Sequence, residues 1–249
     1  MTDNKNSAQQ SSSSTVPFEL LTTMLYDPNQ DPSLPLLERH LNRLRNAHQS
    51  LAIQLPQSWC ATHEPCEPHL IQNKILTVAQ GPIALRLRVT VGPDNQVTII
   101  SSPFITQSRH SQLPISVIDD QPTKYETPFL LFKTTQRDLY DSVRSRHHVS
   151  LVNDGKQPFD VLMYNSDGQL TESTIANVAV KRPDSQTWIT PATSCGLLPG
   201  VKREELLEKG EIQEGIIMIS ELASGTWDVI CFNALRGVYP VQLQLGTNL

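Results

Sequence analysis

The chain has 249 residues, and its 20 lysines and arginines against 25 aspartates and glutamates give a formal net charge of −5 at pH 7. This balance argues against nucleic acid as the main partner, because nucleic-acid binding favours a basic face. A transmembrane helix is not expected, since none of the apolar runs reaches about 18 residues. Four scattered cysteines and the lack of an apolar signal segment predict a reducing, cytoplasmic location.

The first half of the chain predicts an N-terminal α/β domain over residues 16–120, after a polar, serine-rich tail, 1–15, that we expect to be disordered. Apolar side chains recur at helical spacing over residues 36–53. Strand-like segments lie on either side of this helix, at 18–27, 84–92, 96–101 and 115–120. The stretch 54–74 is interrupted by proline and predicts a looser connection.

The second half predicts a C-terminal α/β domain over residues 129–249, separated from the first by a polar linker at 121–128. Two strand patterns surround a turn at Asp167–Gly168, and a glycine-containing loop leads into a short helix near Val201. The length allows two domains of this size. We therefore expect a mixed α+β fold in two halves.

A single lysine stands at the end of an apolar run in the stretch PFLLFKTTQRDLYDSV. Lys133 follows a predicted strand, and Thr135 with Asp138 forms a capping-box pattern that predicts a helix start. Apolar neighbours remove water from an ammonium group and lower its pKa, which suits a lysine that attacks a carbonyl or forms a Schiff base. From this stretch alone, however, a lysine that extends from a strand end to solvent is the better-supported interpretation.

Three other segments carry residues with possible roles in cofactor binding. Glu172 follows the Asp-Gly turn, where a carboxylate could pair with a protonated pyridine nitrogen. Gly200, Val201 and Lys202 open a predicted helix, whose free N–H groups suit a phosphate. Arg43 lies on the first predicted helix and could bind a phosphate with its guanidinium fork. Taken singly, each is explained as well by an ordinary hairpin glutamate, helix start or solvated helix face.

Five motifs in sequence order resemble those of the class IV aminotransferase family, the fold-type IV pyridoxal-phosphate enzymes. They are HLNRL, FKTT with Arg137, DGQLTESTIANVAV, CGLLPGVKR and CFNALRGVYPV, and the similarity extends over residues 18–245. The resemblance implies a two-domain fold like that of D-amino-acid aminotransferase, with pyridoxal 5′-phosphate in the cleft between the domains. It also implies a homodimer.

The resemblance assigns roles to individual positions. Lys133 matches the lysine that binds the cofactor covalently, and Glu172 matches the carboxylate that faces the pyridine nitrogen. The matching phosphate-binding positions are Arg43, Gly200, Val201 and Lys202.

Further matches lie beside the cofactor and the substrate. Thr22 and Thr23 match a polar pair next to the cofactor, and one of them could relay a proton. The candidate substrate contacts are Arg86 or Arg88, Arg137, Asn233 and Arg236. Leu25 departs from the family pattern, which often has arginine there, and a polar tail replaces the usual glycine-rich, acidic segment before the first strand.

Within the family, LLTTMLYDP, FKTTQRDLY and NALRG look most like aminodeoxychorismate lyases. This likeness implies cleavage of 4-amino-4-deoxychorismate to 4-aminobenzoate and pyruvate in the folate pathway, with Lys133 as the general base. A branched-chain or D-amino-acid-type transaminase is the alternative, since it uses the same lysine. A catalytically silent paralogue that binds the cofactor is a further alternative.

Several cysteines and histidines are expected to have structural rather than catalytic or metal-binding roles. Prolines at 65 and 68 interrupt the spacing Cys60-x-x-His63-x-x-Cys66-x-x-His69, so we expect a connecting loop and no metal site. Cys195 and Cys231 are expected to be packing residues, and His147 with His148 the polar end of a helix.

Overall fold

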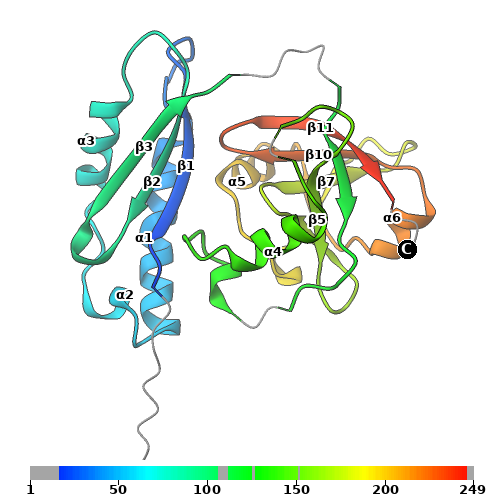
Figure 1. The fold of residues 1–249 in the computed structure, drawn as a ribbon, viewed down its shortest axis with the longest axis horizontal. Coiled ribbons are helices and arrows are strands. Elements are labelled where there is room, and N and C mark those ends of the chain that lie inside the picture. The colour runs from blue at the N-terminus through cyan, green and yellow to red at the C-terminus, as the bar shows by residue number, and fades with distance from the viewer. Residues whose placement is uncertain (1–16, 106–111, 125–126, 151, 246–249) are drawn as a thin grey trace, which may run out of the picture.

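The computed structural model describes residues 17–105, 112–124, 127–150 and 152–245, which form two sheets lying side by side (Figure 1). The first sheet has three strands and the second has eight. None of the helices in these described ranges is long and apolar enough to cross a membrane.

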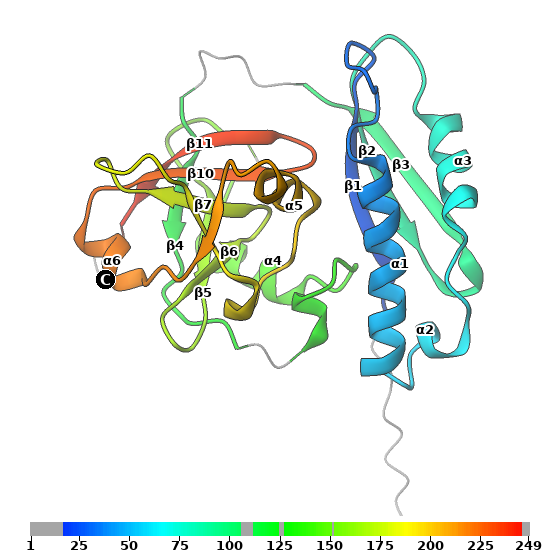
Figure 2. The ribbon, with the colours of Figure 1, turned by 180° about the vertical axis from the view of Figure 1, so that it is seen from behind.

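The first domain is an antiparallel sheet covered by helices. Its strands are β1 (Leu20–Tyr26), β2 (Leu85–Val91) and β3 (Val97–Pro103), in the order β1-β2-β3. Helices α1 (Leu37–Gln54) and α3 (Pro68–Val78) pack on this sheet, with the short α2 (Trp59–Thr62) and a 3-10 turn, η1 (Pro93–Asn95), at its edge (Figure 2). Alternate residues of β1, such as Leu20 and Met24, are buried against the apolar stripe of α1.

The loose connection expected over 54–74 is wrong in part, because α3 begins within it. Pro68 occupies the first turn of α3, where proline costs no hydrogen bond and already has a helical φ. Ile71 and Ile75 then bury one face of this helix in the core of the first domain.

The second domain is built on the eight-stranded mixed sheet, in the order β6-β5-β4-β11-β10-β7-β8-β9. Its strands are β4 (Ile115–Ile118), β5 (Pro158–Tyr164), β6 (Leu170–Ser173), β7 (Asn177–Lys181), β8 (Ile189–Pro191), β9 (Gln213–Gly215), β10 (Asp228–Asn233) and β11 (Gly237–Gln244). Its helices are α4 (Asp138–Arg146), α5 (Val201–Glu208) and α6 (Ile219–Ser224), with 3-10 turns η2 (Pro128–Leu130) and η3 (Thr193–Cys195).

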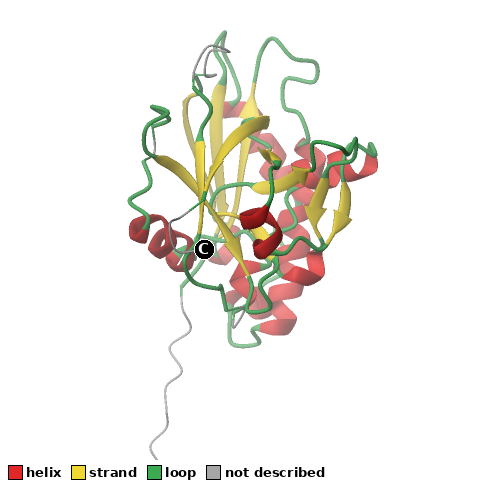
Figure 3. Ribbon diagram, turned by 90° about the vertical axis from the view of Figure 1, so that its right-hand side faces the viewer, coloured by secondary structure: helices red, strands yellow, loops and turns green. Residues whose placement is uncertain are grey.

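The strands of the eight-stranded sheet, which faces the viewer in Figure 3, are strongly twisted, and β6 is hydrogen-bonded to the segment that follows β9. The N–H of Leu170 in β6 donates to the carbonyl of Ile217, just after β9, at 2.8 Å, and the N–H of Ile219 donates to Gly168 at 2.9 Å. The edge strand β6 is therefore hydrogen-bonded, at Leu170, to the segment that follows β9, which leaves less open sheet edge.

The change from one sheet to the other falls earlier than the linker expected at 121–128. Strand β4, which the sequence analysis assigned to the first domain, pairs in parallel with both β5 and β11. The passage between the sheets therefore lies after β3 and before β4, and the described parts of the expected linker, residues 121–124 and 127–128, belong to the second domain.

The segment around Lys133 differs from the strand and capping box that its sequence predicts. Residues 128–130 form the turn η2, and the ring of Phe129 packs 5.0 Å from that of Phe18 in the first domain. The Thr135 hydroxyl accepts from the N–H of Glu19 at 2.9 Å, so it does not cap α4, which begins at Asp138. The apolar run is thus used to attach this segment to the first domain.

Candidate active site

A cleft of about 520 Å³ lies between the two domains. The first domain contributes residues of β1, β2 and α1, and the second contributes the turn between β6 and β7, the loop into α5 and the turn between β10 and β11. Lys133 and Glu172 both line it, although 39 positions separate them in the sequence (172 minus 133).

The amine of Lys133 is held where its charge is disfavoured. Burial is the main cause that lowers its pKa to about 7, and the positive charges of Arg43 and Arg137 add to it against the opposing Glu172. The backbone fixes the residue, because the Lys133 carbonyl accepts from the N–H of Leu21 in β1 at 2.9 Å. A lysine with this pKa holds a large neutral fraction at pH 7, as a nucleophile or base requires.

Glu172 is buried at the end of β6, where Asn177 Nδ2 donates to its Oε2 at 3.5 Å and two further donors contact Oε1. The Tyr140 hydroxyl donates to Oε1 at 2.8 Å and the N–H of Leu198 donates to the same oxygen at 3.1 Å. Burial raises the pKa of Glu172 to about 7, in spite of these hydrogen bonds and the charge of Lys133. The ionised form of a carboxylate buried in this way is stabilised most when a cationic partner enters the cleft.

Arg43 reaches the cleft from α1. Burial lowers its pKa to about 10. One guanidinium nitrogen, Nη2, donates to Thr22 Oγ1 at 2.5 Å, while the buried Nε has no partner among the described residues. A guanidinium left partly unsatisfied at the edge of a cleft has hydrogen-bonding capacity for an anion.

The two threonines proposed as a polar pair lie on different faces of β1. Thr23 lines the cleft. Thr22 is buried and points to α1, where its hydroxyl contacts His40 Nδ1 at 2.7 Å in addition to Arg43. A proton relay through Thr22 does not fit this orientation, since successive side chains of a strand point to opposite faces. Thr22 instead orients Arg43.

The N-terminus of α5 opens onto the same cleft. Gly200 is its N-cap, and Gly200, Val201 and Lys202 all line the cavity. The first N–H groups of a helix have no partner within the helix, and they favour an anion such as phosphate. A Cβ at Gly200 would lie 2.2 Å from Asn177 Oδ1, so only glycine fits here.

Replacing Gly200 by alanine is expected to weaken binding of pyridoxal phosphate at least about tenfold. The backbone φ of −75° at this position is ordinary for alanine, so the loss arises from displacement of Asn177 and the loop beside α5. Absorbance titration of the cofactor-free variant measures the affinity. Pyridoxal without phosphate is the control ligand, and an equal loss for both ligands would contradict a phosphate site at this helix.

The candidate substrate arginines of the first domain share one face of β2. Arg88 lies opposite Thr23 and Arg86 opposite Leu25 in the antiparallel register, and both arginines line the cleft. The sequence leaves open which of these two arginines contacts the substrate. Both lie on the same wall of the cleft, and Arg88 is the more buried of the two.

The two candidate substrate contacts on the turn between β10 and β11, Asn233 and Arg236, differ in how far protein partners occupy their side chains. The guanidinium of Arg236 lies 5.5 Å from the ring centre of Phe159. Asn233 holds the turn that carries Arg236, because its Oδ1 accepts from the N–H groups of Leu235 at 3.0 Å and Arg236 at 2.8 Å. Its Nδ2 donates to Ile175. Asn233 thus shapes the wall of the cleft, and Arg236 presents a charge there.

Arg137 and Arg144 complete the wall on the side of α4. Arg137 Nη2 donates to the carbonyl of Thr174 at 3.0 Å. Arg144 was not among the predicted site residues, because it lies outside the five motifs. Its spacing offered a signal, since residues 137, 140 and 144 recur at i, i+3 and i+7 and face the same side of the helix.

Two groups outside the cleft have structural explanations. Burial raises the pKa of the Cys60 thiol to about 12, and Cys66 is also buried, as are Cys195 and Cys231. His63 contacts Asp94 at 3.0 Å. The expected connecting loop is wrong in part, because Cys60 lies in α2 and His69 in α3.

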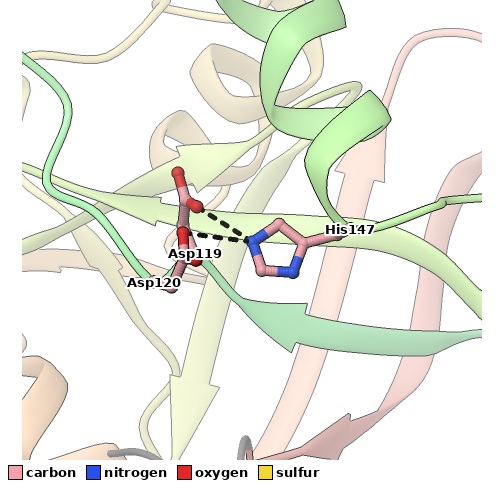
Figure 4. A group of neighbouring side chains, drawn as sticks. All are labelled: Asp119, Asp120 and His147. Carbon is pink, nitrogen blue, oxygen red and sulfur yellow. Dashed lines mark hydrogen bonds and ion pairs between the residues drawn. The ribbon is translucent and has the colours of Figure 1, made fainter.

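A cluster of Asp119, Asp120 and His147 closes the end of α4 (Figure 4). His147 Nε2 lies 2.9 Å from Asp119 Oδ1, and Arg146 donates to both oxygens of Asp119 at 2.7 and 2.8 Å. The guanidinium occupies the position beside the carboxylate that a cation would take, so the cluster is an ion-pair network at the polar helix end.

Burial of both Lys133 and Glu172 predicts that these two residues together destabilise the cofactor-free protein most near pH 7. The folded-state pKa of Lys133, about 7, lies below its ordinary 10.5, so the unfolded state binds more protons between these values and stability rises with pH there. The folded-state pKa of Glu172, about 7, lies above its ordinary 4.5, so stability falls as pH rises from 4.5 to 7.

Urea unfolding of the wild type and of the double variant Lys133→Met, Glu172→Gln tests this dependence. The free energy of unfolding gained by the variant is expected to peak near pH 7, with slopes of up to about 1.4 kcal/mol per pH unit on either side. A gain that is constant from pH 4.5 to 10.5 would contradict the two shifts.

Comparison with known proteins places these residues in a family context. The family model described as amino-transferase class IV matches residues 19–243. A Schizosaccharomyces pombe protein named "Putative aminodeoxychorismate lyase" is 34% identical over 224 residues, which are 88% of this chain and 87% of that protein. Saccharomyces cerevisiae aminodeoxychorismate lyase is 36% identical over 131 residues, which are 49% of this chain and 34% of that protein.

Solved structures share the fold. A "Putative amino-acid aminotransferase" from Mesorhizobium loti has a TM-score of 0.76 at 28% identity, over 91% of this chain and all (100%) of that one. The 4-amino-4-deoxychorismate lyase of Pseudomonas aeruginosa has a TM-score of 0.68 at 20% identity, over 91% and 83%. A Mycobacterium tuberculosis "hypothetical aminotransferase" in PLP-bound form has a TM-score of 0.64 at 17% identity, over 91% and 81%. These likenesses confirm the predicted fold class.

Proposed function

The chain belongs to the class IV aminotransferase family, and from this premise we propose that it is a pyridoxal-phosphate-dependent 4-amino-4-deoxychorismate lyase. The substrate would be cleaved to 4-aminobenzoate and pyruvate. The observation that carries the proposal is the meeting of Lys133 and Glu172 in one cleft between the domains. The lyase names of the two yeast relatives support this reaction within the family.

The side chains of the cleft fit pyridoxal phosphate at each end. Lys133 offers a neutral amine for the aldehyde, and the buried Glu172 offers a carboxylate for the ring nitrogen. Arg43 has an unpartnered, buried Nε among the described residues, and α5 begins with free N–H groups beside it, which suits the phosphate. When bound, pyridoxal phosphate supplies an electron sink for bond breaking at the carbon that carries the amino group.

The protein's own residues then have separate tasks. The amine of Lys133 removes the proton from the amino-bearing carbon of the substrate and acts as general base. Glu172, fixed by Tyr140, keeps a negative charge beside the pyridine nitrogen. The arginines of the cleft hold the substrate carboxylates.

The bond changes balance without a second substrate. The carbon–oxygen bond to the enolpyruvyl group breaks, and its methylene carbon takes up a proton as pyruvate forms. The six-membered ring that remains becomes aromatic, which drives the reaction towards 4-aminobenzoate. Because the two products together contain all atoms of the substrate, neither an amino acceptor nor an oxidant is required.

A transaminase is the second candidate, favoured by the likeness to the Mesorhizobium loti protein. Such an enzyme uses the same lysine but moves the amino group to a 2-oxo acid. Incubation of the holoenzyme with aminodeoxychorismate alone separates the two. The lyase gives 4-aminobenzoate and pyruvate in equal amounts. Amino transfer to 2-oxo acids with no pyruvate from aminodeoxychorismate would overturn the proposed function.

A further inference from the structure

Arg144 is anchored on one side and free on the other. Its Nη1 donates to Thr174 Oγ1 at 2.9 Å and lies 3.5 Å from Asp160 Oδ1. Its Nη2 is buried and has no partner among the described residues. Because the side chain lines the cleft, the anchored half of the guanidinium fixes its direction and the other half keeps hydrogen-bonding capacity.

Thr174 joins Arg144 to a second arginine. The Thr174 carbonyl accepts from Arg137 Nη2 at 3.0 Å, while its hydroxyl accepts from Arg144 and donates to Asp160 Oδ1 at 2.5 Å. One residue therefore sets the positions of two guanidinium groups that both line the cleft. The buried Asp160 is the carboxylate that fixes the pair from behind.

Arg236 is the third member of this group. Its guanidinium lies over Phe159, the residue next to Asp160, and the carbonyl of Phe159 also accepts from Arg144 Nη1 at 3.4 Å. The charges of Arg137 and Arg236 both act to lower the pKa of Arg144, for which burial is the main cause. Positive charges collected in this way are stabilised by an anion.

The balance of charge in the cleft also favours an anionic substrate. Its lining includes six arginines and two lysines but a single carboxylate, Glu172, which the cofactor would engage. A phosphate at Arg43 and α5 would use only part of this charge. Among the remaining arginines, Arg144 lies 3.5 Å from Asp160 and Arg137 lies 3.8 Å from Asp141, and neither of these carboxylates lines the cleft. The wall that faces the substrate would therefore still carry more positive than negative charge.

We propose that Arg144, oriented by Asp160 and Thr174, forms with Arg137 and Arg236 a carboxylate subsite on the second-domain wall of the cleft. This subsite would complement the Arg86 and Arg88 wall and select substrates that carry two carboxylates. Arg144 is the specificity-determining residue, and Asp160 and Thr174 are positioning residues. The inference rests on the proposed function, in which the substrate is a cyclic dicarboxylate.

Substitution of Arg144 by glutamine tests the subsite in the holoenzyme. We expect the KM for aminodeoxychorismate and the Kd for chorismate, an unreactive dicarboxylate without the amine, to rise about 10- to 100-fold, with a smaller change in kcat. Arg144→Lys should recover part of this loss, because it restores the charge but not the fork. Arg45→Gln, on the exposed side of α1, is the matched control.

Folding is controlled separately, because Arg144→Gln leaves Asp160 without its cation. Thr174→Val keeps both charges and removes only the orienting hydroxyl, so it should raise the Kd for chorismate with the cofactor absorbance unchanged. An unchanged chorismate affinity in Arg144→Gln would overturn the subsite. If Arg144→Gln does not fold, an unchanged affinity in both Thr174→Val and Arg144→Lys would overturn it.

The outcome also separates this inference from the proposed function. If the wild type releases no pyruvate from aminodeoxychorismate, the lyase assignment fails. The subsite is then tested by comparing amino transfer to 2-oxoglutarate, which has two carboxylates, with amino transfer to pyruvate, which has one. A selective loss for 2-oxoglutarate in Arg144→Gln supports the dicarboxylate subsite, and equal effects on both acceptors contradict it.

Discussion

Lys133→Ala is expected to lower turnover at least ~10³-fold and to abolish the absorbance band near ~410–420 nm that we expect of the wild type with pyridoxal phosphate. Alanine removes the amine that we propose both binds the cofactor covalently and acts as general base, while the backbone hydrogen bond to Leu21 does not involve the side chain and persists. Visible spectra, turnover and melting temperature are measured on the same preparation.

The matched control for this variant is Lys124→Ala, an exposed lysine outside the cleft. It should keep the band and the turnover of the wild type. A Lys133→Ala protein that retains the band would show that another amine holds the cofactor. If neither the wild type nor the variant has a band, the cofactor assignment is wrong.

Glu172→Gln is expected to reduce turnover roughly 10²- to 10³-fold, or about 3–4 kcal/mol, while the cofactor band is retained. Glutamine has the same shape and can still accept a hydrogen bond from Tyr140. It carries no charge, so it does not keep the pyridine nitrogen protonated, and the ring becomes a weaker electron sink. Steady-state kinetics and the spectrum of the loaded protein measure both effects.

Glu211→Gln, an exposed carboxylate after α5, is the control for the loss of one negative charge. Its turnover should equal that of the wild type. If Glu172→Gln is as active as this control, the carboxylate has no role beside the ring nitrogen. Loss of the band in Glu172→Gln would instead indicate that the residue acts in cofactor retention.

The elements with a strong periodic pattern were predicted well, and those defined by distant partners were not. Helix α1 and strands β1 to β3 follow the expected segments within a few residues, because their buried faces recur at regular spacing. Strand β4 is four residues long, and its place depends on β11, more than 100 residues later. A segment that short contains no information about which sheet it joins.

The residues that the motifs single out lie together in the structure, and their roles stay predictions. Lys133, Glu172, Arg43 and Gly200 were assigned from the family resemblance, and all line the same cleft. The orientation of Thr22 depends on the register of β1 against α1, which adjacent threonines cannot reveal. Arg144 was missed because its partners lie on β5 and after β6, so its role appears only once those strands are placed beside α4.

The attachment of the Lys133 segment to β1 has a mechanical consequence. The hydrogen bond from Leu21 to the Lys133 carbonyl joins the lysine to the sheet that supports Arg43, whereas Glu172 and α5 belong to the other sheet. Arg39 of α1 is also paired with Glu204 and Glu208 of α5, which gives the two halves a second connection. A molecule bound by Lys133, Arg43 and Glu172 together would therefore add a third link between the two sheets.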